Sequence, residues 1–106
     1  MSGDHLLVMT TSPDAQTAER LAALLVDESL AACVNILPPM QSIYRWQGER
    51  QQGEEHQLLI KTCDDRYTEI ENYIKKHHPY ELPEILGLPI QRGLTEYLGW
   101  VTDTTR

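Results

Sequence analysis

Residues 32–63, ACVNILPPMQSIYRWQGERQQGEEHQLLIKTC, decide the fold of this chain. Two runs that are rich in β-branched, aromatic and other apolar residues, 32–37 and 41–47, predict the two parts of one long strand, the second in the chain. They are separated by Pro38-Pro39, which cannot donate to a sheet ladder and therefore predicts a bend or bulge at a sheet edge. The polar residues 48–53 predict a hairpin connection, and the last ten residues of the stretch, with three consecutive apolar side chains, predict the strand that returns.

A strand and a helix precede this hairpin. Residues 5–11 have a continuous apolar centre and predict an inner strand that is covered on at least one face. Ser12-Pro13-Asp14 predicts the start of a helix, because Ser12 suits the N-cap, Pro13 the first helical position and Asp14 the positive end of the helix dipole. The helix should end near residues 27–29, and its buried stripe has the spacing i, i+3, i+4, i+7: Ala18, Leu21, Ala22 and Leu25.

A second helix follows the hairpin, capped by Asp64 or Asp65. Pro79 should end this helix, because a residue before proline disfavours helical geometry. Residues 84–91 predict a last strand, in which Pro89 indicates an edge or an irregularity. A short C-terminal helix should begin after Gly93. The apolar stripes of the two helices are Tyr67, Ile70 and Ile74 in the first, and Leu94, Tyr97, Leu98 and Val101 in the second.

The order strand, helix, strand, strand, helix, strand and C-terminal helix predicts an α+β fold of the ferredoxin-like split βαβ type. Its antiparallel sheet should carry the two main helices on one face. The chain has 106 residues, so residues 1–106 should form a single domain whose core needs neither a disulfide nor a structural metal.

The second strand is too long for a compact subunit of this size. From residue 32 to residue 47 it would span roughly 50 Å if straight, whereas the expected radius of gyration is about 13 Å. The hairpin must therefore bend or project, and Tyr44 and Trp46 lie on one face of its far end. We expect a partner subunit to cover these aromatic rings; the alternative is that they pack under the C-terminal helix.

Net charge and cysteine spacing limit the partners and the cellular compartment that can be expected for this protein. The 9 basic and 16 acidic residues give a net charge of -7, and no basic cluster is present, which argues against nucleic acid and membrane surfaces as partners. Residues 1–5 carry no positive charge and the apolar run 6–9 is short, so we expect a cytoplasmic protein. Cys33 and Cys63 favour free buried thiols in a reducing compartment over a disulfide or a zinc site.

Several motifs in this order resemble the CutA divalent-ion tolerance proteins. The resemblance covers nearly the whole chain, and several separated motifs agree at once. The residues that carry it are Ala31-Ala32-Cys33-Val34-Asn35-Ile36, Ser42-Ile43-Tyr44-Arg45-Trp46-Gln47-Gly48, Glu55, Lys61-Thr62, His78-Pro79-Tyr80, Pro83-Glu84-Ile85 and Tyr97-Leu98-Gly99-Trp100.

The resemblance implies a ferredoxin-like subunit, similar in fold to the PII signalling proteins, that assembles as a cytoplasmic homotrimer. It also implies a role in tolerance of copper and other divalent metals, with copper bound through His77 and His78. A third ligand in bacterial members, a cysteine at the end of the first strand, aligns here with Thr10, which has no sulfur.

Other interpretations of the same residues remain open. His77 and His78 at the end of a helix also suit a simple interaction with the helix dipole and the last carbonyl groups. Adjacent helical residues point about 100° apart, so one ion cannot easily take both rings unless Pro79 distorts His78 or a neighbouring subunit contributes a ligand.

Glu81 and Glu84 could add ligands, although acidic residues in such loops are more often solvated or paired with a basic side chain. Lys61 is expected to pair with Glu55 or Glu84, either across the sheet or across the trimer. No nucleophile and base pairing, phosphate-binding loop or two-carboxylate motif is present, so the sequence predicts no catalytic residue.

Two alternatives to metal tolerance share this fold or its trimeric assembly. The chain could be a PII-like trimeric regulator that binds a small molecule or a partner protein in clefts between subunits, with metal affinity secondary. An RNA-binding module would display aromatic side chains on the central strands, and residues 54–63 contain none. Fold alone does not decide among these functions.

Overall fold

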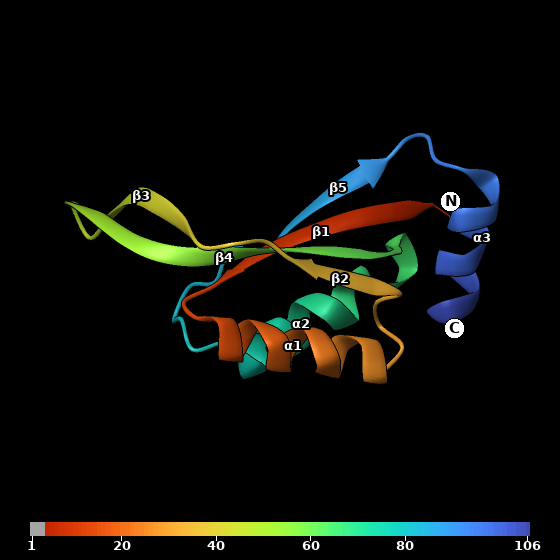
Figure 1. Ribbon diagram of the computed structural model, residues 1–106, viewed down its shortest axis with the longest axis horizontal. Coiled ribbons are helices and arrows are strands. Elements are labelled where there is room, and N and C mark those ends of the chain that lie inside the picture. The colour runs from red at the N-terminus through yellow and green to blue at the C-terminus, as the bar shows by residue number, and fades with distance from the viewer. Residues whose placement is uncertain (1–3) are drawn as a thin grey trace.

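The computed structural model describes residues 4–106, and the expectation for the N-terminus falls partly on residues 1–3, outside that range. Figure 1 shows a sheet with two helices on one face and a third helix at one end. The elements are β1 (His5–Ser12), α1 (Ala15–Asp27), β2 (Cys33–Ile36), β3 (Met40–Trp46), β4 (Glu49–Cys63), the 3-10 helix η1 (Asp64–Arg66), α2 (Tyr67–His77), β5 (Leu86–Ile90) and α3 (Thr95–Thr104).

The sheet has the strand order β2-β4-β1-β5, and β3 pairs with the first half of β4. β4 is antiparallel to β1, β2 and β3, and β1 is antiparallel to β5. The predicted α+β fold of the ferredoxin-like type, with an antiparallel sheet and helices on one face, is confirmed. Pro89 lies on the edge strand β5, so its missing N–H does not remove a hydrogen bond between central strands.

The core lies between the sheet and helices α1 and α2. All four residues of the predicted α1 stripe are buried, and Ile70 and Ile74 of α2 are fully buried while Tyr67 packs against them. β1 contributes Leu6 and Val8, and β4 contributes Leu58 and Ile60, by strand alternation.

The predicted helix starts are wrong in detail. Asp14, not Ser12, is the N-cap of α1: its carboxylate accepts from the Thr17 N–H at 2.7 Å, and this bond lowers the pKa of Asp14. Ser12 remains in β1 and donates to the Asp14 carbonyl. Asp64 and Asp65 do not cap α2; they lie in η1, and the side chain of Asp65 pairs with Arg106 instead.

The predicted polar connection at residues 48–53 is also wrong, because β4 begins at Glu49. The turn consists of Gln47 and Gly48, which have φ values of 52° and 82°. Two consecutive positive φ values suit a tight two-residue hairpin turn of the type that matches strand twist. The polar residues that follow the turn are strand residues on a ribbon exposed to solvent, so their polarity reflects exposure rather than a loop.

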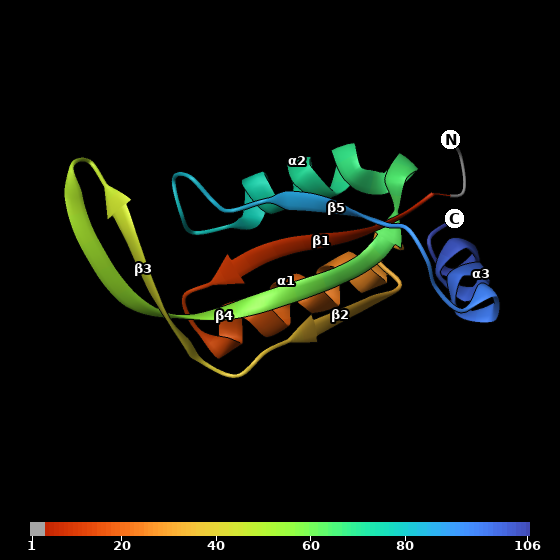
Figure 2. The same cartoon turned by 90° about the horizontal axis from the view of Figure 1, so that it is seen from above.

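The β3–β4 hairpin projects beyond the helices, at the opposite end of the molecule from α3 (Figure 2). The radius of gyration is 14.3 Å, above the value of about 13 Å for a compact chain of this length, and the longest dimension is 44 Å against 25 and 24 Å. The alternative in which Tyr44 and Trp46 pack under the C-terminal helix is therefore wrong for the single chain. Tyr44 is 51% exposed and Trp46 is 36% exposed.

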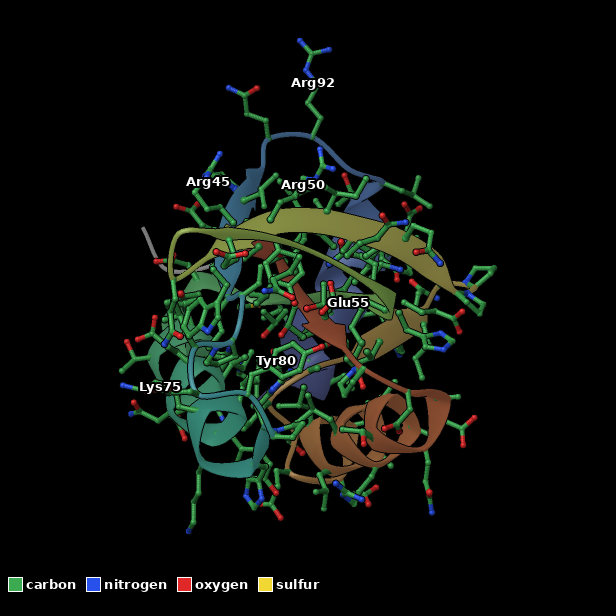
Figure 3. The ribbon with its side chains drawn as sticks, turned by 90° about the vertical axis from the view of Figure 1, so that its left-hand side faces the viewer. Arg45, Arg50, Glu55, Lys75, Tyr80 and Arg92 are labelled. Atoms are coloured by element: carbon green, nitrogen blue, oxygen red, sulfur yellow. The ribbon has the colours of Figure 1, made fainter. Side chains whose placement is uncertain are left out.

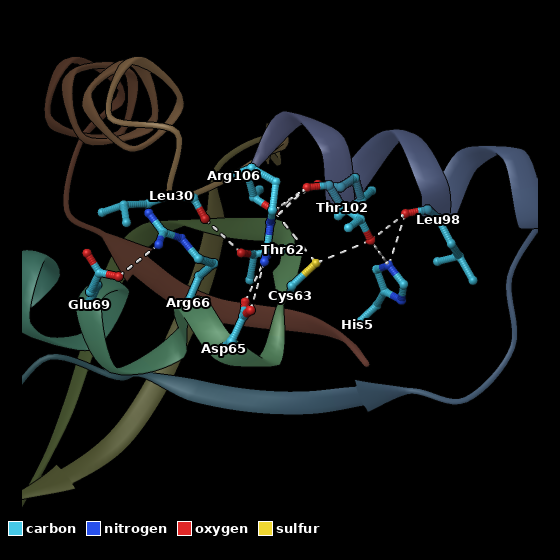
Figure 4. A network of polar contacts seen from close by, with 12 residues as sticks. His5, Leu30, Thr62, Cys63, Asp65, Arg66, Glu69, Leu98, Thr102 and Arg106 are labelled. Carbon is cyan, nitrogen blue, oxygen red and sulfur yellow. Dashed lines mark hydrogen bonds and ion pairs between the residues drawn. The ribbon is translucent and has the colours of Figure 1, made fainter. Parts of the chain in front are cut away.

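The sheet face opposite α1 and α2 is covered at one end by α3. His5 shares its Nε2 atom between the Leu98 carbonyl and the Thr102 hydroxyl, and the Cys63 thiol contacts Thr102 (Figure 4). Register places further apolar side chains on this face beyond α3, either half-buried or exposed: Leu7, Met9, Leu59, Leu86 and Leu88. Among the described residues, no helix combines the length and apolar character that crossing a membrane requires.

Candidate functional site

The two predicted ligands stand at the end of α2 in different environments. His77 is the last residue of the helix and is exposed, with its ring tilted against Tyr73 at a centroid distance of 4.4 Å. Within residues 4–106 its imidazole makes no hydrogen bond. In this part of the chain, no hydrogen bond competes with an ion or with solvent for the exposed His77 ring.

His78 is buried, with 8% of its surface exposed, and its backbone has left the helix at φ -82° and ψ 140°. This extended geometry is the expected effect of Pro79 on the residue before it. The His78 Nε2 atom lies 2.6 Å from the Thr11 carbonyl oxygen, and the Tyr80 N–H donates to His78 Nδ1 at 3.1 Å. Since Nδ1 accepts, Nε2 carries the proton and donates to Thr11, so both nitrogens are already bonded.

Tyr80 continues the polar chain that starts at His78. Its hydroxyl donates to Glu55 Oε2 at 2.8 Å, which joins the segment after α2 to β4 at the root of the hairpin (Figure 3). Burial and then the hydrogen bond to Glu55 raise the pKa of the Tyr80 phenol well above its ordinary value of 10.0. The phenol therefore stays protonated and remains a donor at physiological pH.

Glu84 and Glu81 belong to no group of three ligating side chains within residues 4–106. The Gln57 amide donates to the Thr10 carbonyl at 2.8 Å and to Glu84 Oε2 at 3.4 Å, which gives Glu84 a partner on β4. Glu81 is exposed. In the part of the chain that the structure describes, no group of three or more His, Cys, Asp or Glu side chains could hold a metal ion.

Thr10 occupies the strand position at which the resemblance implied a third ligand. Its side chain is fully buried on the helix-facing side of β1, and its hydroxyl oxygen has no hydrogen-bond partner among residues 4–106. Met9 lies on the opposite face and is half-buried, as strand alternation predicts. The residues present thus offer one accessible imidazole, one imidazole whose nitrogens are both bonded, and a buried hydroxyl in place of a thiolate.

This donor set fits the coordination of a metal ion by His77 alone, but it does not fit chelation of one ion by both His77 and His78 in the folded chain. Imidazole suits copper, zinc and nickel, and a hydroxyl with no sulfur does not favour Cu(I). A more complete coordination sphere would need ligands from outside the chain.

Within the chain, Lys61 pairs with neither Glu55 nor Glu84, so the expectation of a pair across the sheet is wrong, and a pair across subunits stays a prediction. The Lys61 ammonium donates to the Asn35 side-chain oxygen and lies 3.9 Å from Cys33 Sγ, because Cys33 is opposite Lys61 in the β2–β4 register. Both cysteines are free thiols; Cys63 is buried as expected, whereas Cys33 is half-exposed.

Sequence reasoning did not find the bonds that hold His78 and Tyr80. Thr11 precedes His78 by 67 positions and Glu55 precedes Tyr80 by 25, so the contacts depend on tertiary structure. The available local signal was Pro79, which indicated that His78 leaves the helix.

Comparison with known proteins supports one family. The family model described as CutA1 divalent ion tolerance protein matches residues 6–104. The divalent-cation tolerance protein CutA of Thermus thermophilus is 46% identical over 99 residues, which cover 93% of this chain and 96% of that protein.

Solved structures give the same result. The divalent cation tolerance protein (Cut A1) from Thermus thermophilus superposes with a TM-score of 0.94 at 44% identity, covering 96% of this chain and 99% of that one. A protein from Archaeoglobus fulgidus, described as periplasmic divalent cation tolerance protein CutA, gives 0.93 at 36% identity, covering 96% and 99%.

Proposed function

Because this chain belongs to the CutA1 divalent ion tolerance family, we propose that it binds a divalent metal ion, most readily copper, and acts in metal-ion tolerance or response. We propose further that it is a cytoplasmic, single-domain protein with no catalytic activity. The observation that carries the metal-binding part is the exposed His77 imidazole, which no hydrogen bond within residues 4–106 occupies.

Copper is the metal that this donor favours. Among divalent first-row ions, affinity for a nitrogen site rises to Cu²⁺ and falls again at Zn²⁺, so an imidazole that selects by affinity alone takes copper first. The net charge of -7 mildly concentrates cations near the surface. Both effects act on His77 without a preformed cage, and they support a modest rather than a tight site.

We propose that the protein is a homotrimer. Two surfaces support self-association: the apolar sheet face beyond α3, with Leu86 53% and Leu88 42% exposed, and the projecting hairpin, with Tyr44 and Trp46 exposed. The two outer strands of the sheet, β2 and β5, add unpaired backbone groups that a neighbouring copy can cover. Symmetric copies would also supply the further ligands that His77 lacks in one chain.

Calorimetric titration with Cu²⁺ tests the metal-binding proposal. We expect saturable binding to the wild-type chain and weaker binding in the variant His77→Ala, which leaves the bonds of His78 in place. Lys76→Ala, on the same exposed turn of α2, is the matched control and should bind as the wild type does. Equal binding by all three proteins would contradict the assignment of the site.

A PII-like regulator is the second candidate function. The hydroxyl of Tyr80 and the carboxylate of Glu55 lie at the root of the projecting hairpin. A neighbouring copy could complete a cleft there for a small molecule or a partner protein. A thermal-shift screen against phosphorylated and carboxylated metabolites tests this function. A metabolite that raises the melting temperature without metal would favour it, and a screen with no such metabolite would count against its small-molecule form.

A further inference from the structure

The adjacent residues His77 and His78 differ in exposure and in the hydrogen bonding of their ring nitrogens. His77 is exposed and its ring makes no hydrogen bond to the residues that the structure describes, whereas His78 is 8% exposed and bonded at both nitrogens, to the Thr11 carbonyl and to the Tyr80 N–H. A metal ion needs a nitrogen lone pair. The lone pair of His78 Nδ1 is engaged with Tyr80, and Nε2 has its proton directed at Thr11.

We propose that His78 is a fastening residue rather than a metal ligand: its imidazole holds the segment after α2 against β1 and so positions Tyr80 for its bond to Glu55. The assignment of His77 as the ligand of the pair rests on the proposed metal-binding function. The fastening role of His78 does not, because it follows from contacts within the chain.

The contacts around the His78 ring explain why a histidine suits this position. The ring accepts a backbone N–H on one side and donates to a backbone carbonyl on the other, so it bridges two main-chain groups that no ladder satisfies. Tyr80 covers the ring at a centroid distance of 4.7 Å. An imidazole that left this position to bind an ion would expose the Thr11 carbonyl and the Tyr80 N–H without partners, which costs free energy wherever they stay buried.

The fastened segment also reaches the hairpin. Glu55 is the β4 residue that pairs with Met40 in the first rung of the β3–β4 ladder, and Tyr80 donates to its carboxylate. Gln57, two residues further along β4, bonds Glu84 at the other end of the segment. Release of His78 would therefore loosen the root of the projecting hairpin as well as the end of α2.

Hydrogen exchange at the Tyr80 amide, followed by NMR, tests the fastening role. We expect His78→Ala to raise the exchange rate of this amide by roughly two- to tenfold, the effect of losing one hydrogen bond, and His77→Ala to leave it unchanged. Equal exchange rates in the wild type and both variants would overturn the proposal.

The ring nitrogens of the wild-type protein give a second readout that does not depend on how well a variant folds. Long-range ¹H–¹⁵N spectra should show His78 as the Nε2–H tautomer alone, and a His78 ring that averages between tautomers would also overturn the proposal. Titration with Zn²⁺, a diamagnetic ion that imidazole binds, should shift the His77 nitrogens before those of His78. A Zn²⁺-induced shift that appears first at His78 would overturn its fastening role. No shift at either ring would contradict the proposed metal function instead, and the exchange experiment alone would then decide the role of His78.

Discussion

At the scale of single residues, two buried threonines differ in whether their hydroxyl group is hydrogen-bonded. Thr62 and Thr10 are both fully buried, but the Thr62 hydroxyl donates to the Leu30 carbonyl at 2.7 Å, whereas the Thr10 hydroxyl finds no partner in the described part of the chain. A buried polar group without a bond costs free energy, and the same group with a bond contributes to stability.

This contrast predicts opposite effects of the same substitution. Thr10→Val should raise the free energy of unfolding by about 1 kcal/mol, because it replaces an unbonded hydroxyl with a methyl group of similar shape. Thr62→Val should lower it by about 1–3 kcal/mol, because the Leu30 carbonyl loses its donor. Urea denaturation at a fixed protein concentration measures both, and destabilisation by Thr10→Val would show that its hydroxyl has a partner in solution.

Local backbone geometry and the strand face of each residue were predicted from the sequence more reliably than the hydrogen-bond and ion-pair partners of the side chains. The sequence predicted that His78 leaves the helix, because a proline follows it, and that Met9 and Thr10 lie on opposite faces of a strand. It did not predict that Asp65 pairs with Arg106 or that Tyr80 reaches Glu55, because 41 and 25 positions separate these residues. The long-range bonds decide which of the two histidines keeps accessible nitrogens.

At the scale of elements, α3 is held by polar contacts at both of its ends. His5 bonds the Leu98 carbonyl near its start, and Arg106, just after its end, forms a two-point ion pair with Asp65 at 2.9 Å (Figure 4). The hydrogen bond from Arg106 lowers the pKa of Asp65 below its ordinary value of 3.8. The apolar contribution of α3 is small, since Val101 is buried while Leu94 and Tyr97 are exposed.

The Asp65 pair predicts an acid-sensitive contribution to stability. Because the folded pKa lies below the unfolded one, the contribution is present above about pH 4 and is lost as the pH falls through the folded value. Asp65→Asn should therefore reduce stability at pH 7 and have little effect at pH 2. The effect should be modest, because both side chains are exposed.

Thermal unfolding of three proteins between pH 2 and pH 7 checks this expectation. Asp64→Asn, a charge change at the neighbouring exposed position, is the matched control and should not reproduce the pH dependence. A loss of stability in Asp65→Asn that is the same at both ends of the range would exclude the ion pair as its cause.

Element types and order were predicted from hydrophobic periodicity, whereas element ends were not. The α1 stripe is buried as the spacing of its apolar residues requires. The start of α1 was misplaced because Ser12, Pro13 and Asp14 all suit the first positions of a helix, and the strand continues through Ser12. The hairpin turn was missed because a polar, exposed strand has the composition of a loop.

At the scale of the whole molecule, the single chain leaves apolar surface at both ends. The hairpin carries exposed aromatic rings far from the core, and α3 exposes 45% of Trp100 and 41% of Tyr97 at the other end. The sequence predicted the projecting hairpin from strand length alone, because a strand of that length exceeds the core. In the proposed homotrimer a second molecule would cover it, and a single sequence does not specify the geometry of that contact.

The proposed burial of the hairpin rings against another copy predicts that removing the rings weakens self-association. Trp46→Ala combined with Tyr44→Ala should weaken self-association at least about tenfold, because large aromatic side chains dominate interface energies. Val26→Ala, on α1 and 41% exposed, is the matched apolar control and should leave association unchanged. Sedimentation velocity over a range of concentrations measures the difference, and equal association of both variants would exclude the hairpin from the interface.

Native mass spectrometry with and without Cu²⁺ tests the proposed metal-binding homotrimer most directly. We predict a species of three times the chain mass of 12.2 kDa that gains copper ions when Cu²⁺ is added. The same species should form in His77→Ala and gain fewer ions. A spectrum of single chains, or trimers that take up copper equally with and without His77, would contradict the proposal.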